Sequence, residues 1–95
     1  MSRRALITGG GGAMAAEIAA RLDTQGYEFV LVDVDEERMA AVAATLRGAT
    51  TTRVADLSDP AQIRDVAAWI AAEHADLDLL VNNAGIIRPG DVSDV

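Results

Sequence analysis

The chain has 95 residues, 51% of which are hydrophobic, and it carries a formal net charge of −7. Its length allows one domain with an apolar core, its acidity disfavours nucleic acid as a partner, and its lack of cysteine excludes disulfides, thiolate metal sites and cysteine nucleophiles. The apolar stretch after Arg3 and Arg4 is too short for a signal peptide, and no segment is long enough to cross a membrane. We therefore expect a cytoplasmic protein with no membrane partner.

Four short apolar runs predict β-strands, at residues 5–8, 29–33, 51–56 and 77–82. Their lengths and β-branched residues are typical of strands. The second and fourth runs are continuously apolar rather than alternating. This pattern indicates strands that are covered on both faces, as in a parallel sheet.

Three stretches between these runs carry apolar residues at helical spacing. They are Met14, Ile18 and Leu22 with Ala15 and Ala19; Met39, Val42, Ala43 and Leu46; and Ile63, Val66, Ala67, Ile70 and Ala71. The third predicted helix has a start signal: Asp59 can cap free backbone N–H groups, Pro60 follows it, and Gln62 falls at the reciprocal capping position. Gly48 is the expected stop of the second helix.

The resulting order of elements is β-α-β-α-β-α-β. Right-handed crossovers then predict an α/β fold, a Rossmann-type parallel sheet with helices on both faces in three layers. We expect residues 1–95 to form one dinucleotide-binding domain that is incomplete at its C-terminus, because the tail from residue 86 to 95 begins a loop and completes no element.

A glycine-rich run, Thr-Gly-Gly-Gly-Gly-Ala-Met-Ala at residues 8–15, lies directly between the first predicted strand and the first predicted helix. Glycine there permits a tight turn and lets backbone N–H groups approach a pyrophosphate, which the helix N-terminus also attracts. Gly9, Gly12 and Ala15 have the spacing at which small residues serve the turn, the phosphate approach and the helix–strand contact. The alternative is a flexible β-to-α turn without a ligand. A P-loop NTPase is excluded because no Lys-Ser/Thr pair follows.

Asp33 ends the second predicted strand, 21 residues after Gly12. At this position an acid accepts hydrogen bonds from the ribose hydroxyls of NAD and repels the extra phosphate of NADP. The competing interpretation is helix capping, for which Asp35 is the better candidate. Since Val34 rather than a basic residue comes next, the sequence favours NAD over NADP.

The segment Asn82-Asn83-Ala84-Gly85 follows the fourth predicted strand and brings two amides and a glycine to the carboxyl edge of the sheet, where ligands bind in such folds. With this segment the chain resembles the short-chain dehydrogenase/reductase family from Ala5 to Ile86, because it matches the family's NNAG motif. Thr8-Gly9 is similar to the start of the family's TGxxxGxG loop, although Ala13 and Ala15 stand where that loop has its second and third glycines.

The resemblance implies cofactor-binding roles for a set of residues along this edge. Those on or near the glycine loop contact phosphate, Asp33 contacts ribose, Asp56 and Leu57 contact adenine, and the Asn-Ala-Gly segment completes the site. The full set is Gly9, Gly12, Ala13, Met14, Asp33, Asp56, Leu57, Asn83, Ala84 and Gly85. No metal-binding residues are expected.

The resemblance also implies hydride transfer between NAD(P) and a small-molecule alcohol or ketone, and a homo-oligomer for the complete protein. The family's general acid/base is a Tyr whose partner is a Lys four residues on. This chain has no lysine, and position 31, four residues after its only tyrosine, Tyr27, is leucine. Arg does not replace that Lys, so we expect no catalytic residue here and no activity from these 95 residues alone. His74, the only histidine, is expected on the solvated surface.

Two other functions are weighed against an NAD-dependent dehydrogenase. One is a non-catalytic NAD-binding module, acting as a sensor or partner subunit. The other is a Rossmann-like methyltransferase, which the Asn82–Gly85 segment argues against. The substrate and the direction of the reaction cannot be read from this part of the sequence.

Overall fold

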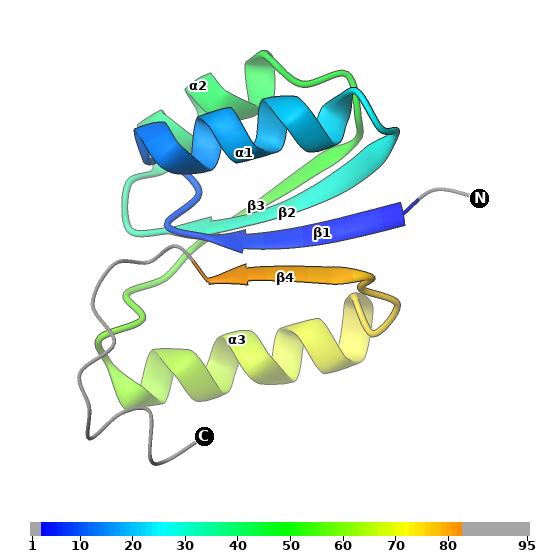
Figure 1. Cartoon of the computed structure of the whole chain (residues 1–95). Helices are drawn as coiled ribbons and strands as arrows, with labels where there is room; N and C mark the ends of the chain where they lie inside the picture. Colours follow the sequence, from blue (N-terminus) through cyan, green and yellow to red (C-terminus); the bar gives the residue numbers. More distant parts are fainter. Residues whose placement is uncertain (1–2, 83–95) are drawn as a thin grey trace.

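The computed structural model describes residues 3–82, which form four strands and three helices (Figure 1). In chain order they are β1 (Arg3–Thr8), α1 (Ala13–Asp23), β2 (Tyr27–Asp33), α2 (Glu36–Ala44), β3 (Thr50–Val54), α3 (Pro60–Glu73) and β4 (Leu79–Asn82). The predicted element order is confirmed, and the ends of individual strands differ from the prediction by one or two residues. Among the described residues, no helix is long and apolar enough to cross a membrane.

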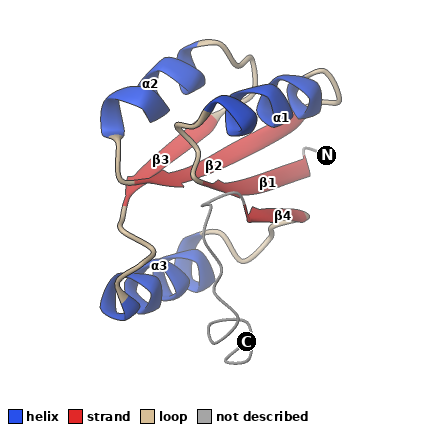
Figure 2. Ribbon diagram, turned by 60° about the vertical axis from the view of Figure 1, so that its left-hand side comes forward, coloured by secondary structure: helices blue, strands red, loops and turns tan. Residues whose placement is uncertain are grey.

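The four strands form one parallel sheet in the order β3-β2-β1-β4. Helices α1 and α2 cover one face and α3 covers the other, so the predicted three-layer α/β/α arrangement is confirmed (Figure 2). In the register, Thr8 lies opposite both Val32 and Asn82. The carboxyl ends of the strands therefore meet at one edge of the sheet.

Each face of the sheet has its own hydrophobic core. The face under α1 and α2 buries alternate residues of β1 and β2 together with Ala15, Ala19 and Met39, and the last three are each 0% exposed. The other face buries Leu6, Val30 and Val32 against Val66 of α3. Strand β2 is thus covered on both faces, as its continuous apolar run predicts.

Strand β4 is less covered than its sequence predicts. Leu79 and Val81 pack against the core beneath α1, but Leu80 on the opposite face is 65% exposed. The reason is positional: in the described part of the chain β4 is an edge strand, and α3 packs over the middle of the sheet rather than over Leu80.

The inward side of α3 also differs from the predicted stripe. Val66 is buried, and Trp69 and Ile70 pack beside it, whereas Ile63 is 46% exposed. Ala67 and Ala71, which the periodicity placed in the stripe, are exposed. The large Trp69 side chain sets the face of the helix that packs on the sheet, because it buries more apolar area than two alanines.

Two end signals act differently from the prediction. Helix α2 ends at Ala44 with Thr45 as its cap, so Gly48 does not stop it; instead, a Cβ at Gly48 would overlap the Tyr27 carbonyl oxygen. Asp59 does cap α3, accepting from the Ala61 N–H at 2.9 Å. Gln62, however, accepts from the backbone N–H of Asp56 at 2.7 Å rather than from that of the cap.

The prediction of a solvated His74 is wrong. This residue follows α3 and is half-buried, and its ring lies edge-on against Trp69 with 4.6 Å between the ring centroids. Arg53 lies over Trp69, its guanidinium carbon 4.8 Å from the ring centroid. A single histidine in sequence carries no sign of this tertiary contact.

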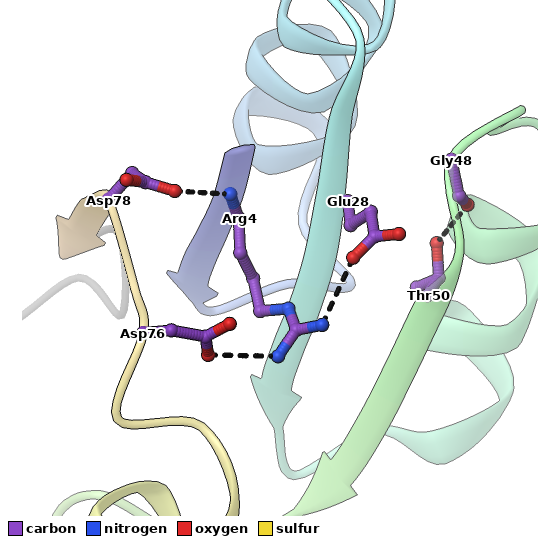
Figure 3. Close-up of polar contacts among 6 residues, drawn as sticks. All are labelled: Arg4, Glu28, Gly48, Thr50, Asp76 and Asp78. Atoms are coloured by element: carbon purple, nitrogen blue, oxygen red, sulfur yellow. Dashed lines mark hydrogen bonds and ion pairs between the residues drawn. The ribbon is translucent and has the colours of Figure 1, made fainter. Parts of the chain in front are cut away.

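Arg4 joins three segments at the amino end of β1 (Figure 3). Its guanidinium lies 3.0 Å from a carboxylate oxygen of Glu28 on β2 and 3.0 Å from one of Asp76, which precedes β4. Its backbone N–H donates to Asp78 at 2.9 Å. These contacts stabilise the pairing of β4 with β1 at the end of the sheet opposite the glycine loop.

Candidate functional site

The polar residues predicted from sequence come together at the carboxyl edge of the sheet. The glycine loop follows β1, Asp33 ends β2, Asp56 follows β3 and Asn82 ends β4. The glycine loop lies between β1 and α1 (Figure 1). In open α/β sheets this edge is where ligands bind.

The glycine loop turns tightly into α1. Gly9 has a φ of 66°, a left-handed conformation that glycine adopts without strain. The Gly12 N–H donates to the Gly9 carbonyl at 3.0 Å, and Gly12 is the N-cap residue of α1. No side chain caps this helix and its first turn has no acidic residue, so its backbone N–H groups and partial positive charge favour an anion there.

Gly10 and Gly11 are needed for close contact, a role that sequence spacing gave to other positions. A Cβ on Gly10 would lie 2.7 Å from the Cβ of Leu31, and one on Gly11 would lie 2.7 Å from the Cβ of Arg38. The glycine run therefore packs directly on β2 and on the start of α2. The sequence spacing did not predict these contacts, because Leu31 and Arg38 belong to elements distant in sequence. Four consecutive glycines were nevertheless a sign that the loop approaches another part of the chain closely.

Asp33 is bound to the glycine loop through backbone N–H groups. Its Oδ2 accepts from the Gly11 N–H at 2.7 Å, and its Oδ1 accepts from the N–H groups of Val34 at 2.6 Å and Asp35 at 3.4 Å. Within residues 3–82 it forms no ion pair, since the salt bridges found there involve other acids. The carboxylate is thus held in place while remaining half-exposed and uncompensated by a cation.

Asp35 rather than Asp33 caps α2. Its Oδ1 accepts from the Arg38 N–H at 3.0 Å, which confirms the sequence-based choice between the two acids. Asp33 is therefore available for a ligand at the edge of the sheet.

Asp56 and Leu57 lie at the same edge in different environments. The Asp56 carboxylate accepts from the Ser58 hydroxyl at 2.6 Å and from its N–H at 2.9 Å, and these hydrogen bonds hold the pKa of Asp56 below its ordinary value. Leu57 is half-buried and packs against the core beneath α3. Asp56 is the more exposed of the two.

Asn82 ends β4 and contacts the first residue of the glycine-rich run. The Thr8 hydroxyl donates to Asn82 Oδ1 at 3.0 Å, and the Val81 carbonyl lies 3.4 Å from the same hydroxyl. The predicted site residues Asn83, Ala84 and Gly85 lie outside the described residues.

Comparison with known proteins identifies the family. The family model for short chain dehydrogenases matches residues 3–95. The chain belongs to the short-chain dehydrogenase family. Among curated proteins it is similar to D-threitol dehydrogenase of Mycolicibacterium smegmatis, with 38% identity over 88% of the chain and 34% of the relative. It is also similar to the putative ketoacyl reductase 1 of the granaticin polyketide synthase of Streptomyces violaceoruber, with 37% identity over 96% of the chain and 35% of the relative.

Solved structures of this short-chain dehydrogenase family have the same fold. A metagenomic short-chain oxidoreductase in complex with NADP aligns with a TM-score of 0.81 and 30% identity, covering 96% of this chain and 47% of that one. An NAD⁺-bound xylitol dehydrogenase aligns with a TM-score of 0.80 and 25% identity, covering 88% and 34% of the two chains. The chain spans about a third of the length of the curated relatives it matches. The family binds nicotinamide cofactors, and these two structures contain different ones.

Proposed function

We propose that the protein is an NAD-dependent oxidoreductase that transfers hydride between the nicotinamide ring and an alcohol/carbonyl pair, and that this chain supplies its cofactor-binding part. The observation that carries the proposal is the Asp33 carboxylate, anchored 2.7 Å from the Gly11 N–H and without a cationic partner in residues 3–82. A carboxylate held in place beside a glycine loop suits the paired hydroxyls of a ribose.

The glycine loop is the proposed pyrophosphate site. Gly9 and Gly12 shape the turn, and Ala13 and Met14 begin α1, whose end is uncapped by any side chain. Backbone N–H groups at such a helix start bind phosphate oxygens without needing a basic side chain. Ala13 stands where the family's TGxxxGxG loop has its second glycine, and it adds only one methyl group to the proposed pyrophosphate site.

The remaining contacts are proposed from the family motif together with position. Asp56 and Leu57 follow β3 at the carboxyl edge, where the adenine ring would lie, and Asn83, Ala84 and Gly85 are proposed as further cofactor contacts. When bound, NAD supplies the hydride acceptor or donor. This chain's residues bind and orient the cofactor, and the family's Tyr and Lys general acid/base pair has no match in its sequence.

NAD rather than NADP is the proposed cofactor because the Asp33 carboxylate is negatively charged. The 2′-phosphate of NADP would approach Asp33, and two anions at close range repel strongly where water is partly excluded. A small alcohol or ketone is the proposed substrate class, in line with the polyols and ketoacyl compounds in the names of the two curated relatives.

Calorimetric titration of the protein, as its gene encodes it, with NAD and with NADP tests this proposal. We expect NAD to bind at least about tenfold more tightly, since a hydrogen bond to a charged group contributes about 1.5–3 kcal/mol. Asp33→Asn keeps an oxygen that can accept from the Gly11 N–H but removes the negative charge. It should therefore weaken the binding of NAD and narrow the difference in affinity between NAD and NADP.

Asp65→Asn is the matched control, because Asp65 is exposed on α3, is not among the proposed cofactor contacts, and its substitution removes the same charge. It should leave both affinities unchanged. Binding of neither dinucleotide by the unaltered protein would contradict the proposed function, and tighter binding of NADP than of NAD would contradict the cofactor assignment.

A further inference from the structure

Arg38 lies against the proposed ribose end of the site although it is distant from the glycine loop in sequence. A Cβ built on Gly11 would be 2.7 Å from the Arg38 Cβ and 3.0 Å from Asp33 Oδ2. The same glycine therefore touches the base of the Arg38 side chain on one side and the Asp33 carboxylate on the other. Arg38 is in the first turn of α2, three residues after the Asp35 cap.

The Arg38 guanidinium is paired with Asp35 rather than Asp33. Its Nε lies 3.5 Å from Asp35 Oδ2, and the two side chains are 72% and 45% exposed. Asp35 also accepts from the Arg38 backbone N–H at 3.0 Å, so both ends of the residue are tied to the same acid. This leaves Asp33 with backbone N–H donors alone among the described residues.

The other arginine near the carboxyl edge is occupied elsewhere. Arg53, near the end of β3, lies over the Trp69 ring on the α3 side of the sheet, 4.8 Å from its centroid. Arg38 is thus the cation of residues 3–82 whose position beside Gly11 and Asp33 can alter the charge at a ribose 2′ position. Its availability depends on one exposed ion pair, which holds it only weakly.

We propose that the Asp35–Arg38 pair adds to the preference for NAD that Asp33 sets, by withholding the Arg38 guanidinium from the ribose end of the site. While the pair is closed, the 2′-phosphate of NADP faces the uncompensated Asp33 carboxylate. Once Asp35 loses its charge, Arg38 is free to bind that phosphate, which guanidinium groups recognise with matched geometry. This inference rests on the proposed function, because it concerns the same cofactor site.

The test is Asp35→Asn in the protein as its gene encodes it, titrated with NAD and with NADP. Asparagine caps a helix as well as aspartate does, so α2 should be retained, and an unchanged Tm checks this. We expect the affinity for NADP relative to NAD to rise about fivefold, the scale of one exposed ion pair. An unchanged ratio in a folded variant that still binds NAD overturns the inference and leaves the proposed function standing.

A double-mutant cycle separates release of Arg38 from simple loss of a negative charge. In the Arg38→Gln background, Asp35→Asn should leave the NADP-to-NAD ratio within about twofold of its starting value. An equal rise in both backgrounds would overturn the inference in favour of general electrostatics. Arg53→Gln is the control for the loss of one positive charge. In the Arg53→Gln background, Asp35→Asn should still raise the NADP-to-NAD affinity ratio about fivefold.

If the unaltered protein binds neither dinucleotide, the proposed function fails first. That result is distinct from the failure of the inference, which requires NAD binding to be intact.

Discussion

The Thr8 hydroxyl donates a hydrogen bond to Asn82 Oδ1 at 3.0 Å, joining the last residues of β1 and β4. The two residues are 74 positions apart in the chain, and each belongs to a sequence motif of the family. Their contact fixes the edge strand β4 to the strand that carries the glycine loop. The position of the carboxyl end of β4 relative to the glycine loop therefore depends on it.

Thr8→Val should lower the free energy of unfolding by about 1 kcal/mol, the typical net contribution of one hydrogen bond. Thr8→Ser keeps a hydroxyl and should recover most of that loss. Urea denaturation provides the measurement, and Thr52→Val, on an exposed position of β3, is the control that should be nearly neutral. Equal stability of Thr8→Val and the unaltered protein would show that the hydroxyl contributes nothing.

Gly11→Ala should both destabilise the protein and weaken NAD binding. The added methyl would lie 2.7 Å from the Arg38 Cβ and 3.0 Å from Asp33 Oδ2, so α2 and the loop must separate. Overpacking of this kind costs about 1–3 kcal/mol. Thermal unfolding and NAD titration measure the two effects.

Gly26→Ala is the comparison for that substitution. Gly26 has a φ of 83° and nothing within 4 Å of an added Cβ, so only backbone strain of about 1–2 kcal/mol is expected there. It should leave NAD affinity unchanged. If Gly11→Ala binds NAD as tightly as Gly26→Ala, then the close approach at Gly11 does not shape the cofactor site.

Met39→Ala should cost about 2–5 kcal/mol, because Met39 is 0% exposed and fills the core between α2 and the sheet. Met14→Ala makes the same chemical change at a residue that is 65% exposed, and it should change stability by less than about 0.5 kcal/mol. Denaturant midpoints of the two variants measure the difference. Similar values for both would contradict the assignment of the core.

Asp23 should make the stability of the protein depend on pH in the acid range. Hydrogen bonds from the backbone N–H groups of Arg47 and Gly48, both at 2.9 Å, hold the pKa of Asp23 below its ordinary value of 3.8. A carboxyl with a lowered pKa in the folded state stabilises fully above its unfolded pKa and loses this effect as the pH falls through the folded value. Stability should therefore decline below about pH 4.

Asp23→Asn removes this titration and should give a shallower loss of stability between about pH 5 and pH 2. Urea midpoints across that range measure the slope. Asp65→Asn is again the control, since it removes an exposed carboxylate that forms no hydrogen bond between segments within residues 3–82. A slope in Asp23→Asn as steep as in the control would refute the role of Asp23.

The order of elements and the parallel sheet were predictable from the sequence alone. Alternating helical and strand periodicities leave few arrangements once crossovers must be right-handed, and the central run of β2, residues 29–32, is continuously apolar because both of its faces are covered. The capping by Asp35 and Asp59 was also predictable, because a helix cap acts on backbone N–H groups only two or three residues away.

Tertiary structure alone decided which residues meet across the molecule. Gly48 looked like a helix stop, yet its size is required by the Tyr27 carbonyl, and His74 looked solvated, yet it packs on Trp69. Likewise, nothing in the spacing of the sequence places Arg38 beside Gly11. Periodicity and capping depend on neighbours within a few positions in the sequence. These contacts depend instead on how the helices pack against the sheet, and the volumes of side chains distant in sequence determine that packing.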